Sequence, residues 1–226
     1  MKHNYKVIMI TYVAMQLFLS LGSKITYALF QAFGMNGTYT WAYAVATWTV
    51  ISFITTLVIT MYHLKDEFSL RNKNHSFFMT IGWSIYGVLL AFITQSIAIM
   101  IESSFGIKSG SNNTESILSL IKIAPFMILV TTIIGPILEE IIFRKIIFGA
   151  LYKKLGFFIS ALISSILFSV AHMEFEHVLL YSAIGFTFSY LYVRTNTIFV
   201  PIFAHTFMNT YIVIGQLISQ NMANLH

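Results

Sequence analysis

Long apolar segments, separated by short polar stretches, follow one another along almost the whole chain. They cover residues 7–33, 39–62, 77–101, 123–152, 157–175, 178–193 and 198–218. A helix needs roughly 20 apolar residues to cross a bilayer, and the second and third segments exceed that length. The pattern predicts an all-α fold, a polytopic membrane helical bundle with about seven transmembrane helices, or about eight if Lys24 lies in a loop within the first segment. The polar residues 63–75 and 102–116 are expected to form aqueous loops.

The composition favours a membrane protein over a soluble one. The 226 residues are 57% hydrophobic and 9% charged, and their mean hydropathy is +0.78. A soluble domain carries about 25% charged residues, and a core cannot grow without limit at this chain length. We therefore expect residues 1–226 to form a single integral membrane domain. The chain has no cysteine, which excludes disulfides, thiolate nucleophiles and cysteine-ligated metals.

The 13 Lys and Arg residues are scattered between the apolar segments, which indicates membrane topology and not a nucleic-acid-binding surface. If the N-terminus is cytoplasmic, only Lys24, Lys108 and Lys122 remain on the outer side. That bias favours a cytoplasmic N-terminus. No clear small-x-small cleavage site follows the first apolar segment, so we expect a retained helix broken near Gly22, and not a signal peptide. The abundance of Ile, Phe, Asn and Lys suggests a bacterial protein, which would lie in the cell membrane.

Two adjacent carboxylates, Glu139 and Glu140, lie in an almost wholly apolar segment, and Arg144 follows them. Ionisable groups are costly in hydrocarbon, so their presence marks a functional site by default. Glu140 and Arg144 are four residues apart and can form an ion pair on one helix face. Glu139 is rotated by about 100° from Glu140. We therefore expect Arg144 to neutralise Glu140, and Glu139 to face a cavity.

Three more polar side chains, His172, His205 and Asn209, interrupt later apolar segments. Phe168 precedes His172 by four residues, and His205 precedes Asn209 by the same spacing, so each pair shares a helix face. With a rise of about 1.5 Å per residue from the cytoplasmic helix ends, both histidines fall near the depth of Glu139, around mid-membrane. The sequence therefore predicts one site that joins a carboxylate and two imidazoles.

Other notable residues are interpreted structurally. Pro136 removes a backbone hydrogen bond, so we expect a bend just before the acidic pair that either opens space for it or serves packing alone. Pro201 fits the first turn of its helix. The many Phe, Tyr and Met side chains are assigned to packing or lipid contact. A polar cluster is interpreted as a solvated helix end; it consists of Glu174, Glu176 and His177.

The predicted site has the groups needed to hydrolyse a peptide bond. A carboxylate beside a neutral histidine can hold and deprotonate a water, and a second histidine with an amide can stabilise an oxyanion. The same three groups, Glu139, His172 and His205, could instead hold Zn²⁺. The sequence leaves both alternatives open, so the cofactor is either none or zinc.

The three spaced motifs resemble those of a known family. They are Glu139-Glu140-x-x-x-Arg144, Phe168-x-x-x-His172 and His205-x-x-x-Asn209. In this order on apolar helices, within residues 117–218, they resemble the CPBP family of CAAX proteases and bacteriocin-processing enzymes, also called Abi or Rce1-like. One departure is Lys145, where the family often has glycine.

The resemblance implies an intramembrane endopeptidase and a role for each matched residue. Glu139 and His172 would activate the attacking water, and His205 and Asn209 would form the oxyanion site. Glu140 and Arg144 would be structural, and we expect Phe168 to pack under the histidine.

The implied substrate is a peptide or protein with a membrane-associated segment, such as a bacteriocin or a pheromone under maturation. A second hypothesis is a non-proteolytic membrane regulator or immunity protein that keeps the fold and acts by binding. A third is a proton- or metal-coupled transporter, which would usually show repeated halves. We see no such repeat.

Overall fold

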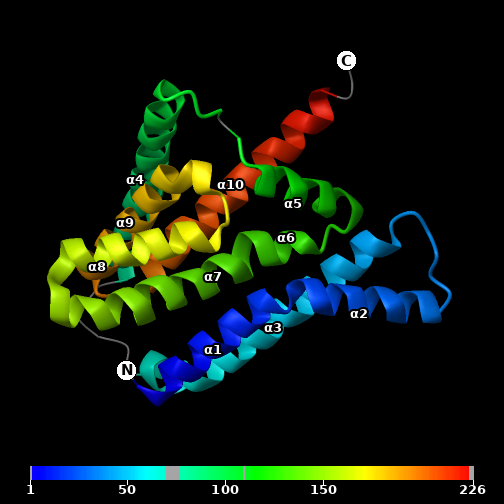
Figure 1. Cartoon of the computed structure of the whole chain (residues 1–226). Helices are drawn as coiled ribbons and strands as arrows, with labels where there is room; N and C mark the ends of the chain where they lie inside the picture. The colour runs from blue at the N-terminus through cyan, green and yellow to red at the C-terminus, as the bar shows by residue number, and fades with distance from the viewer. Residues whose placement is uncertain (1, 70–76, 109, 224–226) are drawn as a thin grey trace. The chain divides into compact units, whose positions relative to one another are not determined.

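The structure, a computed structural model, describes residues 2–69, 77–108 and 110–223. The described residues contain helices and no strand (Figure 1). Their long apolar helices confirm the predicted fold class, an all-α membrane bundle. The chain divides into two compact units, residues 1–71 with 114–135, and residues 72–113 with 136–226.

The first unit is built around one long helix. Its elements are α1 (His3–Leu17), α2 (Leu19–Ala32), α3 (Thr40–Ser69), most of α5 (Asn112–Ile123), α6 (Met127–Leu129) and the π-helix η1 (Val130–Ile134). Helices α1, α2, α6 and η1 all pack against α3. Within the described residues, this unit carries none of the predicted site residues.

The first apolar segment is broken, but not at the predicted place. Helices α1 and α2 meet at Phe18 with a bend of 57°. Gly22 lies inside α2 instead, where a Cβ atom would collide with the indole ring of Trp48. The glycine therefore permits close helix packing, and the prediction of a break near Gly22 is wrong.

Helix α3 extends into the stretch predicted as an aqueous loop. Its last turns carry Lys65, Asp66 and Glu67. The carboxylate of Glu67 accepts hydrogen bonds from Lys2 Nζ and Tyr5 Oη, both at 2.8 Å. The loop prediction fails here because the charged residues are used to hold the start of α1 against the end of α3. Residues 70–76 of the predicted loop lie outside the described residues.

The second unit contains all the predicted site residues. Its elements are α4 (Phe77–Ser104), α7 (Gly135–Glu139), the π-helix η2 (Glu140–Phe148), α8 (Gly149–Ala171), the 3-10 helix η3 (Phe175–His177), α9 (Val178–Thr195) and α10 (Phe199–Ala223). Helices α4, α9 and α10 share an apolar core, formed by Val88, Ala91, Ile184, Phe188, Leu191, Val200, Ala204 and Met208. Pro201 lies in the first turn of α10, as predicted.

A sharp turn at Gly156 returns the chain along η2. Gly156 has φ +69° and ψ −176°, a conformation that is essentially restricted to glycine. Beyond it, α8 runs back beside η2 (Figure 1). Two of the predicted apolar segments thus form an antiparallel helix pair joined at this residue.

Fewer helices than predicted satisfy a strict test for membrane spans. Among the described residues, three helical stretches are long and apolar enough alone: Thr40–Glu67, Phe77–Ser104 and Met127–Ala171. The bent pair α1–α2 makes a fourth. The third stretch includes the turn at Gly156, so it holds two of the predicted segments. The count of seven spans stays a prediction.

The helix around the acidic pair departs from α geometry. The π-helix η1 ends at Ile134, directly before Gly135 and Pro136, and η2 begins at Glu140. The π turns lie on both sides of α7, and the bend expected just before the acidic pair stays a prediction. Single π turns inside helices occur frequently at functional sites.

Candidate active site

Glu140 is the centre of a buried charge network. Its side chain is fully buried, and Oε1 lies 3.1 Å from Arg144 NH1 and 2.8 Å from His205 Nδ1. The predicted ion pair within η2 is therefore present. The structure adds His205, on α10, as a second partner of the same oxygen. Because a carboxylate only accepts, Nδ1 of His205 carries a proton and donates it.

The Arg144 guanidinium is enclosed by aromatic rings and small residues. It lies over Phe168 at 4.2 Å and Phe188 at 5.3 Å, measured from Cζ to the ring centroids. Helix α9 comes close to it at Gly185, where a Cβ atom would lie 3.1 Å from Arg144 NH2 and 2.9 Å from Ser165 Oγ. The small residues and the rings leave this cation little freedom, so it fixes Glu140 firmly.

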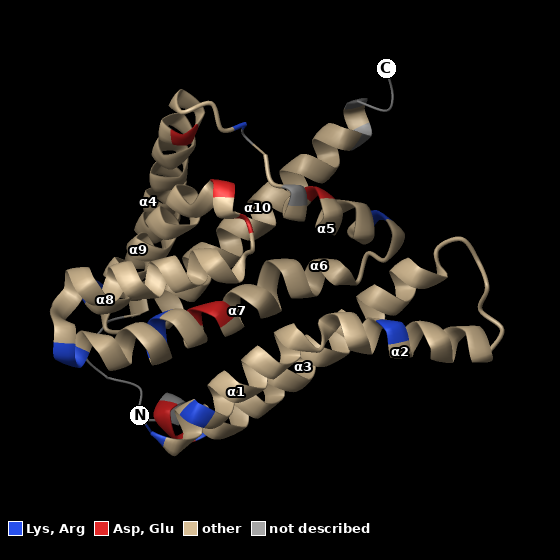
Figure 2. Ribbon diagram, viewed as in Figure 1, with Lys and Arg blue, Asp and Glu red and all other residues tan. Residues whose placement is uncertain are grey.

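Glu139 differs from its neighbour in exposure and in contacts. Its side chain is 20% exposed, whereas that of Glu140 is 0% exposed. Glu139 Oε2 lies 3.6 Å from Nε2 of His205. The two carboxylates therefore face the two nitrogens of one imidazole ring. Figure 2 shows acidic residues in red on α7, in a ribbon that is mainly tan because few residues are charged.

His172 lies just past the end of α8, where the sequence predicted it inside a helix. Its backbone N–H donates to Ser169 O at 3.1 Å, and the helix ends at Ala171. The Nδ1 atom lies 2.8 Å from Phe168 O. A carbonyl oxygen only accepts, so Nδ1 carries the proton, and Nε2 is the basic nitrogen in the neutral ring.

The two histidines are linked through Phe168. The ring of Phe168 contacts His172 at 4.5 Å and His205 at 6.0 Å between centroids. It also lies under Arg144. The predicted packing role of Phe168 is therefore wider than expected, since one ring contacts three site residues.

Helix α9 supplies an aromatic ring to each histidine. Tyr181 stacks on His172 with centroids 4.2 Å apart and planes at 26°. Phe188 stacks on His205 at 4.9 Å and 28°. These residues are seven apart and so lie two turns apart on one face of the helix. From the sequence alone, Tyr181 and Phe188 were assigned only to packing or lipid contact. The spacing of seven on the helix between the two histidine motifs is the signal that could have identified them.

Asn209 follows His205 by one turn of α10 and is half-buried. The spacing of four places it on the same helix face as His205. Its predicted contribution to an oxyanion site stays a prediction.

The prediction that Glu174, Glu176 and His177 form a solvated helix end is wrong for Glu174 and His177. His177 is 7% exposed, its Nδ1 lies 2.8 Å from Glu102 Oε2, and its Nε2 lies 2.7 Å from Gly110 O. Glu174 accepts hydrogen bonds from Ser111 Oγ, from the Asn113 backbone N–H and from Tyr181 Oη. Glu176 is exposed, as predicted.

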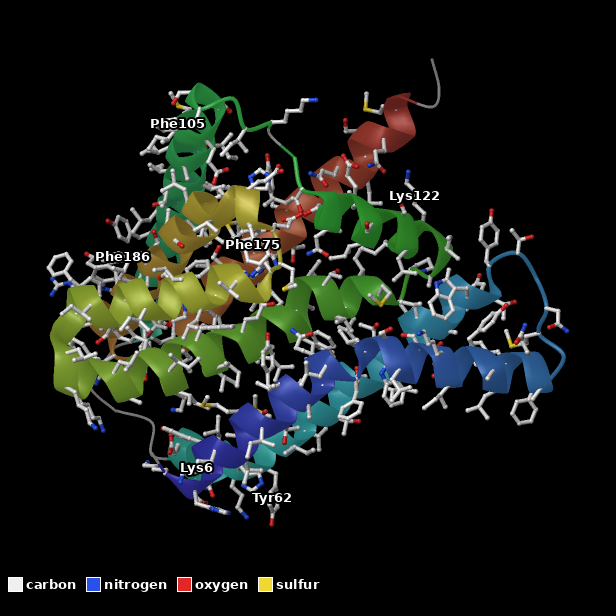
Figure 3. All side chains as sticks on the ribbon, viewed as in Figure 1. Lys6, Tyr62, Phe105, Lys122, Phe175 and Phe186 are labelled. Carbon is white, nitrogen blue, oxygen red and sulfur yellow. The ribbon has the colours of Figure 1, made fainter. Side chains whose placement is uncertain are left out.

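The loop predicted over residues 102–116 is shorter than expected. Helix α4 continues to Ser104, so Glu102 is a buried helical residue, and α5 begins at Asn112. The described residues between them are not helical, and Gly110, Ser111 and Asn113 bind His177 and Glu174 instead of facing only water. Figure 3 labels Phe105, the residue that follows α4, and Phe175, in η3.

The described residues contain no group of three or more His, Asp or Glu side chains arranged to hold a metal ion. One nitrogen of His205 is bound to Glu140 and one nitrogen of His172 to a backbone carbonyl. Such bonds are also usual for metal-bound histidines and would leave Nε2 of each ring to face an ion. The misfit lies in the spacing, because Glu139, His172 and His205 are not grouped closely enough to hold one ion in this arrangement.

The sequence matches a model of one protein family and is similar to two named bacterial proteins. The family is described as "Type II CAAX prenyl endopeptidase Rce1-like", and its profile matches residues 121–211. The protein named "Putative membrane peptidase YdiL", from Bacillus subtilis (strain 168), is 46% identical over 221 residues, covering 96% of this chain and 91% of YdiL. MroQ of Staphylococcus aureus (strain USA300), named as a membrane-embedded CAAX protease, is 36% identical over 146 residues, or 62% of this chain and 59% of MroQ. No solved structure matches.

These similarities and the buried polar site define the class, an intramembrane protease of a bacterial membrane. The chain belongs to the Rce1-like family of CAAX endopeptidases. The resemblance inferred from the three motifs is thereby confirmed. The matched region contains all three motifs.

Proposed function

We propose that this protease cleaves a membrane-associated peptide, of the bacteriocin or pheromone type, with a water activated by Glu139. One observation carries the proposal. The partly exposed carboxylate of Glu139 faces Nε2 of His205 at 3.6 Å, while Glu140 and Arg144 hold the other side of that ring. This distance exceeds a direct hydrogen bond. A water that lies about 2.8 Å from each of these two atoms would form a hydrogen bond to both and bridge them.

The protonation states assigned above suit a hydrolysis. The water donates one hydrogen to Glu139 and the other to the bare Nε2 of His172. Its oxygen attacks the carbonyl carbon as Glu139 takes the first proton. The C–N bond then breaks, and that proton passes to the leaving nitrogen, which yields an amine. The second proton of the water leaves the new carboxyl group through Nε2 of His172 to solvent, which yields a carboxylate. Positioned proton transfer of this kind contributes about 10²–10⁴-fold to a rate.

His205 and Asn209 are assigned to the oxyanion. The His205 ring faces Glu140 through Nδ1 and Glu139 through Nε2, and in its doubly protonated form it donates from both nitrogens. The N–H at Nε2 would donate to the negative oxygen of the tetrahedral intermediate, where a preorganised donor is most effective. The aromatic stacking of Phe188 keeps the ring in this orientation.

The test compares secreted and membrane peptides by mass spectrometry in cells that carry wild-type protein, Glu139→Gln or His172→Ala. We expect a peptide whose cleaved form falls by about 10²-fold or more in both variants. Glu176→Gln is the matched control, because Glu176 is an exposed carboxylate in the same unit. If the cleaved peptides are the same in all four strains while the protein levels are equal, these residues are not catalytic and the binding hypothesis gains support.

A further inference from the structure

The orientation of His172 is not set by a helix. The residue follows the last helical residue of α8, and the next residue, Met173, has a left-handed backbone with φ +57°. A side chain just past the end of a helix can rotate unless contacts hold it. Three contacts are present, which are the hydrogen bond from Nδ1 to Phe168 O, the edge contact with the Phe168 ring and the stacked ring of Tyr181.

Tyr181 is itself held at its hydroxyl. The Oη atom donates to Glu174 Oε2 at 2.6 Å, a short bond typical of a charged acceptor. The bond joins the first turn of α9 to the connection between α8 and α9. The ring plane of Tyr181 is thus fixed at one end by its helix and at the other by a carboxylate.

Glu174 is held in turn by residues of a distant segment. Ser111 Oγ lies 2.8 Å from both carboxylate oxygens, and the backbone N–H of Asn113 donates to Oε1 at 2.9 Å. The adjacent His177 binds Gly110 O and Glu102, which ties the same segment to the end of α4. General packing of a tyrosine would not need such a chain of bonds.

We propose that Tyr181, anchored by Glu174, is a positioning residue for His172. This inference deepens the proposed function, because it rests on His172 as a group that binds the attacking water. The stacked phenol limits rotation of the imidazole, so that the Nδ1 bond to Phe168 is kept and Nε2 points to the water. Glu139 lies within electrostatic range of Tyr181, which is consistent with the position of this ring beside the site.

The experiment uses the full chain in liposomes, with the peptide identified in the cell comparison. Tyr181→Leu removes the ring, and Tyr181→Phe removes only the hydroxyl. Tyr190→Leu is the control, because Tyr190 lies on the same helix and is 37% exposed. A small misplacement of a catalytic group can cost about 10²-fold, so we expect kcat of Tyr181→Leu to fall by about that factor with KM unchanged. Tyr181→Phe should restore most of the lost kcat, and Tyr190→Leu should match the wild type.

A second readout does not need activity. Diethyl pyrocarbonate modifies neutral imidazole nitrogens, and mass spectrometry gives the rate at His172 relative to the exposed His3. We expect faster modification of His172 in Tyr181→Leu than in the wild type. A wild-type kcat together with a wild-type modification rate in Tyr181→Leu would overturn the inference. If Tyr181→Leu does not fold, Tyr181→Phe decides by the modification rate alone. Loss of the anchor should raise the rate at His172, and an unchanged rate would overturn the inference. If Glu139→Gln cleaves normally, the proposed function fails, and the modification rates still test the positioning.

Discussion

At the scale of single residues, two neighbours in the sequence have opposite environments. Glu140 is fully buried and bonded to a cation and an imidazole, whereas Glu139 is partly exposed. A rotation of about 100° between successive residues of a helix explains the difference. The sequence could therefore predict that the two carboxylates have different roles, and it could predict the pair of Glu140 with Arg144.

The buried ion pair gives a stability prediction. Removing one partner of a buried pair costs about 3–5 kcal/mol, because the other charge is left uncompensated. Arg144→Met should lower the free energy of unfolding in detergent by about that amount. The double variant Glu140→Gln/Arg144→Met should recover most of the loss, because it removes both charges of the pair. A single variant as stable as the wild type would show that the pair does not hold the site together.

The contacts of His205 and Tyr181 could not be predicted from the sequence. His205 is 65 positions from Glu140, and Tyr181 meets His172 only because α9 folds back after η3. Helical spacing relates residues within one helix and says nothing of which faces of separate helices meet. The motifs therefore identified the site residues, while the aromatic rings that orient them became visible only in the structure.

At the scale of elements, short connections do much of the positioning. The six residues between α8 and α9, residues 172–177, include His172, Glu174 and His177, and each of these three has a hydrogen-bond partner. Because Glu174, Glu176 and His177 are polar, the sequence predicted that this connection is exposed to solvent. The buried carboxylate Glu102, at the end of α4, reverses that expectation.

The state of His177 gives a pH prediction. Burial lowers the pKa of His177, but hydrogen bonds to Glu102 and Gly110 raise it more, so that it lies above the ordinary 6.5. A raised folded-state pKa means that the stabilisation is complete below 6.5 and is lost as the pH rises through the folded-state value. The unfolding temperature in detergent should therefore fall as the pH rises above 6.5.

His177→Gln is the control for this dependence, and it should flatten the curve above pH 6.5. Burial raises the pKa of Glu174, but the bonds from Tyr181, Asn113 and Ser111 lower it below 4.5. Its contribution is lost only on acidification below that value, so it does not affect this range. Identical curves for the variant and the wild type would contradict the assigned state of His177.

The turn at Gly156 gives a prediction about backbone strain. A Cβ atom there would meet no atom within 4 Å, yet φ is +69°. A residue other than glycine in this conformation costs about 1–3 kcal/mol, so Gly156→Ala should lower the free energy of unfolding by about that amount. Gly215→Ala is the matched control, since it also has open space but lies within α10. Equal stability of both variants would show that the turn does not depend on glycine.

At the scale of the whole molecule, the sequence determined the class of fold and the order of the helices. It could do so because apolar length and the cost of polar groups in lipid are properties of the local sequence. Helix ends were less predictable, because α3 and α4 continue into polar residues that find partners elsewhere in their own units. The span count depends on where the bilayer lies around the helices, and sequence length alone does not give that.

The topology can be tested because the chain has no cysteine. The distribution of Lys and Arg predicts a cytoplasmic N-terminus and an outer position for Lys108. In intact cells, a membrane-impermeant thiol reagent should label Lys108→Cys and should label His3→Cys only after permeabilisation. Both side chains are exposed in the structure, so burial within the protein would not prevent labelling. The opposite pattern would reverse the orientation.

The most direct measurement of the central claim follows the oxygen of the attacking water. Wild-type protein and Glu139→Gln are compared in liposomes, in water enriched in ¹⁸O, with the peptide found in the cell comparison. The wild type should place ¹⁸O in the new carboxylate of the product. The variant should form that product at a rate that is lower by about 10²-fold or more. Labelled product formed at the wild-type rate by Glu139→Gln would contradict the assignment of Glu139 as the residue that activates the water.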